Sequence, residues 1–195
     1  NFPATDDYVR APQEIGPAAI KFGQALATRP DLVGVEAAEN LMQLQDSLPP
    51  ESYPAIKAEI ERALEAPLEL LFSSFDEEPV GSASIAQVHH AVTTEGREVA
   101  VKVLRPGIEE EFARAIETYE WAAAQVEAYG GEAERLRPRL VVAQFRQWTP
   151  RELDLQREGA SASELKENII AEPGYHVPDI DWRRTARRVL TLEWL

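Results

Sequence analysis

One lysine stands in the middle of an otherwise apolar stretch of this sequence. Lys102 lies within Glu98–Leu104, which we interpret as the third of three short strands. An unpaired ammonium group is costly to bury, so packing alone does not account for this cation. Residues 79–84, which are mostly small, form the predicted loop between the first two strands. A small-residue loop followed by a strand with the sequence Val-Ala-Val-Lys is typical of the nucleotide-binding lobes of kinase-like proteins.

Composition and charge exclude several classes of protein. Hydrophobic residues make up 44% of the 195 residues and charged residues 28%, which is the balance of a globular protein. The net charge of −14 argues against nucleic-acid binding, which relies on neutralising phosphates. Because the chain has no cysteine, it has no disulfide, no thiolate catalysis and no cysteine-bound metal. No apolar run reaches the about 18 residues of a membrane-spanning helix, and the first residues do not resemble a signal peptide.

The first 67 residues are predicted to form helices that are separated by prolines. Residues 14–28 repeat apolar side chains at spacings of three and four, which predicts an amphipathic helix with Phe22 on its apolar face. Lys21 and Gln24 are three residues apart on this helix, so they are neighbours on its surface. Gly23 between them is unfavourable in a helix, which indicates that something approaches the backbone closely there.

Further helices are predicted along the chain from their apolar periodicity. Asp31 is expected to serve as the N-cap of the second helix. Thr149, followed by Pro150 and Glu152, has the pattern of a capping box, which predicts that a new helix begins there. These predicted helices cover residues 32–46, 54–66, 108–129, 140–148 and 149–168.

Strands are predicted over residues 72–75, 84–92, 98–104, 177–180 and 188–194, with Gly96 in the turn after the second strand. His89 and His90 are adjacent on that strand and point to opposite faces, so they cannot bind one metal ion together. The order of elements predicts an α+β fold, with a five-stranded antiparallel sheet and packed helices as in the small lobe of a protein kinase. We expect two domains: an N-terminal helical extension over residues 1–67, and the small lobe, with inserted helices, over residues 68–195.

Five short segments occur along the chain in a defined order: KFGQ at residues 21–24, PVGSASIAQVH at 79–89, AVKVLRPGI at 100–108, ELDLQRE at 152–158 and VLTLEW at 189–194. Together they resemble the motifs of the UbiB-like atypical kinase family. The match covers nearly the whole chain from Lys21 onward. The family is linked to ubiquinone (coenzyme Q) biosynthesis and has a protein-kinase-like fold, so the resemblance implies an extension and a small lobe that stops at the hinge.

The resemblance implies roles for several charged residues. Lys102 matches the strand lysine that contacts the α- and β-phosphates of ATP, and Glu158 matches the helix glutamate that orients this lysine. Lys21 matches the lysine of an extension that lies over the active site, where it would pair with Glu152. Gln24 and Asp154 would join Lys21 and Glu152 in one cluster, the Lys21 cluster. The catalytic residues that the resemblance implies are therefore Lys102, Glu158, Lys21, Glu152, Gln24 and Asp154.

The resemblance also implies which residues bind the nucleotide. The family has an alanine-rich loop in place of the usual glycine-rich one, and this chain departs from an all-alanine version at Gly81 and Ser82. Residues 193–195 match the start of the hinge, whose backbone groups would bond the adenine. Gly159 stands where the family often has alanine, which predicts a softer helix around the orienting glutamate. The implied nucleotide-binding residues are Val80, Gly81, Ser82, Ala83, Ser84, Ile85, Ala86, Gln87, Val88, Lys102, Glu193 and Leu195.

ATP with Mg²⁺ is the cofactor that the resemblance implies, and the metal ligands are expected beyond Leu195. The sequence begins at Asn1 and ends inside an apolar run, so we expect it to be a piece of a longer protein. It contains no His-Arg-Asp or Asp-Phe-Gly segment, so this piece alone is expected to be inactive. Whole members of the family resemble ATPases more than protein kinases, and many carry membrane-spanning segments after the kinase-like domain. The whole protein is therefore expected in the cytoplasm, peripheral to or anchored at the inner membrane through that later region.

Alternative interpretations of the same residues stay open at this point. Glu152 could serve only in a helix cap, and Lys102 could pair with Glu158 for structure alone, as in a pseudokinase. A second class of function is a non-catalytic module that binds a lipid precursor or a biosynthetic partner through its helical extension. The expected partners are ATP and a ubiquinone-precursor lipid or ubiquinone-biosynthesis proteins, with no nucleic acid. Only the catalytic interpretation predicts that the Lys102 ion pair faces an open pocket.

Overall fold

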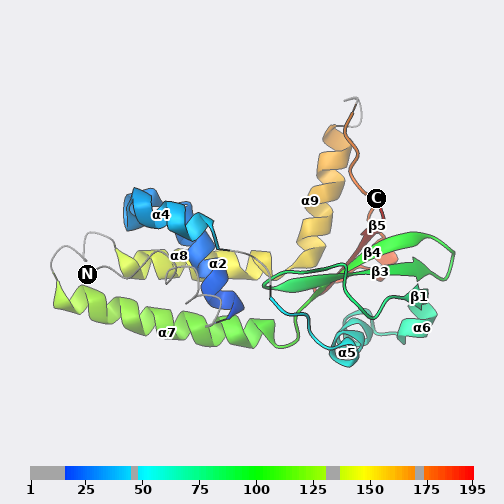
Figure 1. The fold of residues 1–195 in the computed structure, drawn as a ribbon, viewed down its shortest axis with the longest axis horizontal. Helices are drawn as coiled ribbons and strands as arrows, with labels where there is room; N and C mark the ends of the chain where they lie inside the picture. The colour runs from blue at the N-terminus through cyan, green and yellow to red at the C-terminus, as the bar shows by residue number, and fades with distance from the viewer. Residues whose placement is uncertain (1–15, 45–47, 131–136, 170–173) are drawn as a thin grey trace. The chain divides into compact units, whose positions relative to one another are not determined.

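The computed structural model describes residues 16–44, 48–130, 137–169 and 174–195 (Figure 1). The chain divides into two compact units, each built from two separate stretches of sequence. The first unit takes the chain up to Leu48 and Gly107–Pro150, and the second takes Pro49–Pro106 and Arg151–Leu195. The predicted boundary at residue 67 does not coincide with this division, because one helix before that residue belongs to the second unit and two helices after it belong to the first.

The described residues of the first unit form helices. They are α2 (Pro17–Ala27), α3 (Pro30–Val33), α4 (Val35–Met42), α7 (Ile108–Tyr129) and most of α8 (Pro138–Glu152). The Phe22 ring of α2 stacks on Tyr119 of α7 with 4.7 Å between the ring centroids, and it meets Phe145 of α8 edge-on at 5.0 Å. Aromatic pairs in these geometries stabilise a core beyond the area that they bury. The helix predicted over residues 14–28 is therefore present over Pro17–Ala27, and Phe22 packs as expected, but Ile20, Gly23 and Ala27 on the opposite side are buried as well. Residues 14 and 15 lie outside the described residues.

Gly23 lies where α2 closely approaches the residues that follow α4. A Cβ atom at this position would come within 2.5 Å of the Leu44 Cδ1 atom. Glycine costs about 1 kcal/mol relative to alanine inside a helix. The close approach inferred from the sequence is confirmed and explains why a glycine stands there.

The second predicted helix and its cap are wrong. α3 begins at Pro30, so Asp31 lies inside its first turn, where its carboxylate accepts hydrogen bonds from the Arg29 guanidinium at 2.8 Å. Proline at the first helical position sets the start of a helix because its backbone is already in the helical conformation. The predicted helix over residues 32–46 is instead divided at Gly34, whose φ of +84° ends α3 before α4 begins. Residues 45–47 lie outside the described residues.

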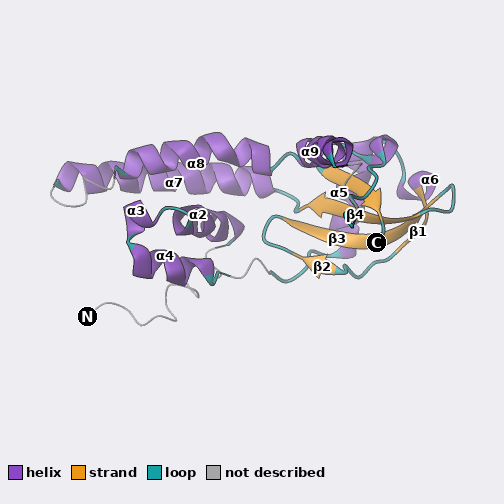
Figure 2. Ribbon diagram, turned by 90° about the horizontal axis from the view of Figure 1, so that it is seen from above, coloured by secondary structure: helices purple, strands orange, loops and turns teal. Residues whose placement is uncertain are grey.

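The second unit is built around a five-stranded antiparallel sheet (Figure 2). Its strands are β1 (Phe72–Phe75), β2 (Gly81–Ser82), β3 (Ala86–Thr93), β4 (Glu98–Leu104) and β5 (Val189–Glu193), and its helices are α5 (Tyr53–Leu64), α6 (Leu68–Leu71), α9 (Leu155–Asn168) and the 3₁₀ turn η2 (Trp182–Arg184). The strand order is β1-β3-β4-β5, and β2 also pairs with β3. The predicted α+β fold is confirmed. The fifth strand is β2, however, and residues 177–180 form only a single bridge, from Ile180 to Leu192.

The two faces of β4 carry different side chains. One face packs with α5 in a core that contains Val99, Val101, Val103, Ile56 and Ile60. Lys102 alternates with these valines and so points to the opposite face. On that face α9 packs against β5 and brings Glu158 to the lysine. Strand alternation thus keeps the lysine out of the apolar core.

The helix predicted to begin at Thr149 does not begin there. Pro150 lies inside α8, and Thr149 Oγ1 donates to a carbonyl one turn earlier, at 2.9 Å, instead of capping a helix. Proline removes one helical hydrogen bond, and here it falls within the last turn of α8. The cap of α9 is Asp154, whose carboxylate accepts a first-turn backbone N–H at 3.2 Å. Because Glu152 ends α8, the capping-box interpretation of this residue is also wrong.

Candidate functional site

The strand lysine and the helix glutamate that the sequence singled out are in contact. Lys102 lies in the middle of β4, opposite Val88 of β3 and Leu190 of β5. Its Nζ atom lies 2.8 Å from both carboxylate oxygens of Glu158. The Lys102 side chain is 27% exposed and the Glu158 side chain 50%, so solutes reach the pair. An ion pair in such a position contributes about 0–1 kcal/mol to stability.

Close packing of α9 on β5 sets the position of Glu158. A Cβ atom added at Gly159 would come within 2.9 Å of Leu190 Cδ1 and 3.4 Å of Ile180 Cγ2. A larger side chain at residue 159 would therefore push α9, and with it Glu158, away from the sheet. Close packing against β5 is therefore a reason for glycine instead of alanine at residue 159. The effect of this glycine on the stiffness of the helix stays a prediction.

The small-residue loop is a hairpin turn between β2 and β3. β2 pairs with Gln87 and Val88, and the Ala83 N–H donates to the Ala86 carbonyl at 2.8 Å, which closes the turn. Residues 80–88, all assigned to nucleotide binding by the resemblance, lie in this hairpin. Its strand β3 is the neighbour of the strand that carries the lysine. Backbone N–H groups at such turns can approach phosphate oxygens, so the hairpin and the ammonium group together suit a polyphosphate.

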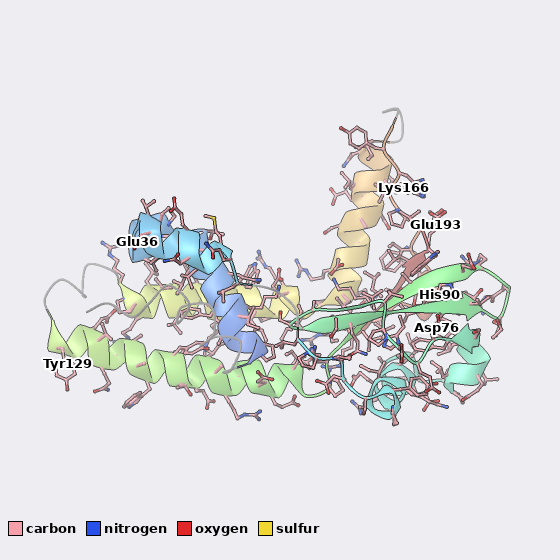
Figure 3. The ribbon with its side chains drawn as sticks, viewed as in Figure 1. Glu36, Asp76, His90, Tyr129, Lys166 and Glu193 are labelled. Carbon is pink, nitrogen blue, oxygen red and sulfur yellow. The ribbon has the colours of Figure 1, made fainter. Side chains whose placement is uncertain are left out.

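A chain of hydrogen bonds leads from the hairpin into the sheet. Gln87 Oε1 accepts the Glu51 N–H at 2.8 Å, and Gln87 Nε2 lies 2.8 Å from His89 Nε2. His89 Nδ1 lies 2.7 Å from the Asp76 carbonyl, so Nδ1 donates while Nε2 accepts, and the ring is neutral. Burial lowers the pKa of His89, although the bond to the Asp76 carbonyl acts in the opposite direction. His90 lies on the other face, next to the Asp76 carboxylate (Figure 3).

The predicted hinge begins at the end of β5. The Glu193 N–H donates to the Asp179 carbonyl at 2.8 Å, and the Glu193 carboxylate accepts from His176 Nε2 at 2.9 Å. The hydrogen bond from His176 lowers the pKa of Glu193. Because the Glu193 N–H is engaged, a base at this strand end would have to use the Glu193 carbonyl or the backbone of Leu195.

Residues 43–195 match the family model of the ABC1 atypical kinase-like domain. The chain belongs to this family. It is 44% identical over 181 residues to a probable protein kinase UbiB of Marinobacter nauticus, and 45% identical over 186 residues to one of Xanthomonas oryzae. Each alignment covers 93% of this chain and 33% of the relative, so the chain spans about a third of the length of these proteins. A solved structure of Rv3197 with erythromycin, from Mycobacterium tuberculosis, covers 89% of this chain and 43% of that chain, with a TM-score of 0.57 and 29% identity.

In this ABC1-family chain, the residues predicted to form the Lys21 cluster over the active site belong to different units. Lys21 and Gln24 lie on α2 of the first unit, whereas Glu152 and Asp154 belong to the second. The Asp154 carboxylate already caps α9. The pairing of Lys21 with Glu152 stays a prediction.

Sequence reasoning missed a second cation beside the hairpin, Arg105. This residue follows β4 directly, and its side chain is 7% exposed. Its guanidinium donates to the Ala83 carbonyl at 3.0 Å and to Ser82 Oγ at 2.9 Å. The only signal in the sequence was its place three residues after Lys102, at the end of the same strand.

The first unit contains an apolar cavity that the sequence did not reveal. Its volume is about 260 Å³, and its lining is almost wholly apolar. Residues from α2, α3, α7 and α8 line it, among them Phe22, Leu26, Leu32, Tyr119, Ala122 and Val142. A cavity of this kind suits an apolar group and offers nothing to a charged one.

Two properties of the described residues concern membranes and metals. None of the helices described here combines the length and the apolar character needed to cross a bilayer. Across the described ranges, no three His, Asp or Glu side chains come together in a way that could hold a metal ion. Magnesium ligands beyond Leu195 stay a prediction.

Proposed function

We propose that this chain is the ATP-binding portion of an atypical kinase or ATPase that supports ubiquinone biosynthesis. The observation that carries the proposal is the accessible ion pair between Lys102 and Glu158, on a strand next to the small-residue hairpin. Membership of the ABC1 family and the likeness to proteins named UbiB support the same function.

Each group at the site has a distinct task in this proposal. Lys102 neutralises charge on the α- and β-phosphates, and Glu158 holds the lysine ammonium group in place. Backbone N–H groups of the small-residue hairpin, other than the Ala83 N–H that closes its turn, bind phosphate oxygens. When bound, ATP with Mg²⁺ supplies the phosphoryl group, and residues beyond Leu195 complete the metal site and the catalytic loop.

The exposure of the ion pair favours a functional over a purely structural role. A pair with half of its glutamate in solvent contributes little to stability, because water screens it. The same exposure leaves the ammonium group accessible, so a phosphate can share it with the carboxylate. A pair retained for structure alone would be expected in a closed, fully bonded position.

The test is Mg-ATP binding and ATP hydrolysis by the full-length protein with Lys102→Ala. Loss of the ammonium is expected to weaken ATP binding at least about tenfold and to abolish hydrolysis, since charge neutralisation dominates phosphoryl transfer. Lys166→Ala is the matched control, because Lys166 lies on α9 and forms an ion pair of 2.6 Å with Asp179. Equal affinity and equal activity in the wild type and Lys102→Ala would refute the proposal.

The apolar cavity of the first unit supports a second candidate function. In this alternative the chain is a non-catalytic module whose helices hold a ubiquinone-precursor lipid, with its prenyl chain in the cavity. The mycobacterial relative was solved in a complex with erythromycin, which supports the idea that proteins of this fold can bind a small organic molecule.

This alternative is tested with a fluorescently labelled prenyl alcohol as the probe. Ala122→Phe would fill the cavity and is expected to abolish probe binding, whereas Ala124→Phe on the same helix, outside the lining, is expected to leave it unchanged. Probe binding that persists in Ala122→Phe would exclude the cavity as the lipid site. Probe binding without any ATP binding by the full-length protein would favour the module over the enzyme.

A further inference from the structure

Arg105 holds the turn of the small-residue hairpin at several points. Its Nε atom donates to the Ala83 carbonyl at 3.0 Å, and its Nη2 atom donates to Ser82 Oγ at 2.9 Å. Its backbone N–H donates to the Ile85 carbonyl, also at 2.9 Å. The side chain is 7% exposed, so these bonds are shielded from competing water. Contacts of one residue therefore fix both sides of the turn.

The other side of the guanidinium ties the hairpin to the segment before α5. Its Nη1 atom donates to Glu51 Oε1 at 2.8 Å, and Nη2 also donates to the Pro49 carbonyl at 2.9 Å. Glu51 balances a charge that would be costly to bury alone. The Glu51 N–H in turn donates to Gln87 Oε1 on β3 at 2.8 Å. The hairpin and this segment thus form one network with Arg105 at its centre.

The bond to the Ala83 carbonyl also fixes the direction of the next N–H. No described peptide bond is cis, and in a trans peptide the C=O and N–H groups point in opposite directions. Because the Ala83 carbonyl faces Arg105, the Ser84 N–H is turned away from the guanidinium. Arg105 thus fixes the orientation of the peptide group between Ala83 and Ser84, and Ser84 is fully buried in this structure.

We propose that Arg105 is the positioning residue of the nucleotide site, which holds the turn at residues 82–85 in the conformation that receives the phosphates of ATP. This role rests on the proposed function, because it explains what holds the shape of the loop that binds the phosphates of ATP in that function. Arg105 acts through the peptide groups of the turn and does not touch the nucleotide. Lysine cannot replace it, because a single nitrogen cannot reach oxygens on both sides of the planar fork.

The test compares ATP with adenosine, which has no phosphates, on the full-length protein. Arg105→Lys is expected to weaken Mg-ATP binding about tenfold, through loss of charge-assisted bonds to the turn, and to leave adenosine affinity within about twofold of wild type. Isothermal titration calorimetry gives both dissociation constants. Arg184→Lys is the matched control, because Arg184 is similarly buried and multiply bonded but lies beside Thr94, past the opposite end of β3. It is expected to leave the ratio of the two affinities unchanged.

The outcomes separate this inference from the proposed function. Wild-type ATP affinity in Arg105→Lys would overturn the role of Arg105, and so would an equal loss of adenosine binding, which indicates general loss of structure. If Lys102→Ala weakens ATP binding while Arg105→Lys does not, only the role of Arg105 is refuted. If the wild-type protein does not bind ATP, the proposed function fails and the role of Arg105 fails with it.

A milder variant keeps the test decisive if Arg105→Lys does not fold. Ser82→Ala removes one acceptor of the guanidinium and leaves its ion pair with Glu51 in place. Because only the bond from Arg105 to the neutral Ser82 hydroxyl is lost, ATP binding is expected to weaken about two- to fourfold. Adenosine binding is expected to stay unchanged. Ser73→Ala on β1, whose hydroxyl donates to the Thr93 carbonyl at 3.0 Å, is its control. Identical ATP affinities in the two serine variants would contradict the proposal.

Discussion

Two ion-paired positions of the second unit use their charges in different ways. Arg184 and Asp181 form a pair whose side chains are only 3% and 5% exposed. The other groups in contact with the Arg184 guanidinium are the Leu71 carbonyl, Thr94 Oγ1, the Glu95 carboxylate and the face of the Phe72 ring. Within the described residues, by contrast, the Lys102 ammonium bonds only the half-exposed carboxylate of Glu158.

The difference separates a charge that holds the fold from a charge that can exchange partners. A buried guanidinium with every side bonded cannot be moved without leaving unpaired charges, so its position is fixed. A lysine that keeps contact with water can accept a phosphate in addition to its carboxylate at low cost. The second arrangement is the one expected of a ligand site.

Arg184→Ala is the variant with the largest expected effect on stability. Removing the guanidinium takes one partner from the buried Asp181 carboxylate and leaves the Leu71 carbonyl without its bond, although Arg97 still pairs with Asp181 at 2.7 Å. The free energy of unfolding is expected to fall by about 3 kcal/mol. Urea denaturation of the full-length protein, followed by circular dichroism, measures the change. A loss below about 1 kcal/mol would show that Arg184 and its partners stabilise the fold no more than a surface ion pair does. The contrast with Lys102 would then be wrong.

Gly159→Val tests whether close packing of α9 positions Glu158. The added side chain meets Leu190, and such overpacking typically costs about 1–3 kcal/mol. Because the helix must move from β5, ATP affinity is expected to fall together with stability. Ala160→Val, at an exposed position of α9, is the control and is expected to change both quantities little. Loss of stability with full ATP affinity would mean that Glu158 keeps its place without this contact.

His89 tests the buried polar network through pH. Burial lowers its pKa in the folded protein below the ordinary value of 6.5, so below that pH the unfolded chain binds a proton that the folded chain does not. Stability is therefore expected to fall as the pH drops below about 6.5, with a limiting slope of about 1.4 kcal/mol per pH unit. His89→Gln is expected to flatten this dependence below about pH 6.5. The lowered pKa of Glu193 acts only at lower pH, where carboxylates begin to protonate. Denaturation midpoints at several pH values measure the slope, and an unchanged slope in His89→Gln would contradict the assignment.

Lys102→Met is expected to have the smallest effect on stability. The lost pair is accessible to water, so the free energy of unfolding should change by less than about 1 kcal/mol in either direction. The same urea denaturation measures it, beside Arg184→Ala. A loss as large as that of Arg184→Ala would place Lys102 among the residues that hold the fold and would favour the pseudokinase interpretation.

Four of the five strands could be predicted from the sequence because their signals are local, whereas the short strand β2 was taken for part of a loop. Alternating apolar residues and the positive φ of Gly96, observed at +83°, mark the hairpin between β3 and β4. The contact between Lys102 and Glu158 joins residues 56 positions apart, so no local periodicity encodes it. It was expected only because the chain resembles a family in which these two positions meet.

The errors arose where one local signal has two structural meanings. Pro150 can begin a helix or lie in the last turn of one, and only the packing of α8 decides. Gly34 lies inside an apolar pattern that reads as one helix, although its positive φ divides it. Arg105 was missed because its role depends on Pro49 and Glu51, which the fold brings to it from far along the chain.

The division of the chain into interleaved stretches has a consequence for the order of synthesis. α2 leaves the ribosome before α7 and α8, so Tyr119 and Phe145, which pack on its Phe22, are made later than Phe22. The second unit likewise lacks β5 until the last residues of this sequence appear. Neither unit can complete its core from one continuous piece of chain, and non-local contacts of this kind slow folding. The helical face around Phe22 must therefore stay exposed during synthesis, at the stage when a nascent chain is most prone to aggregate.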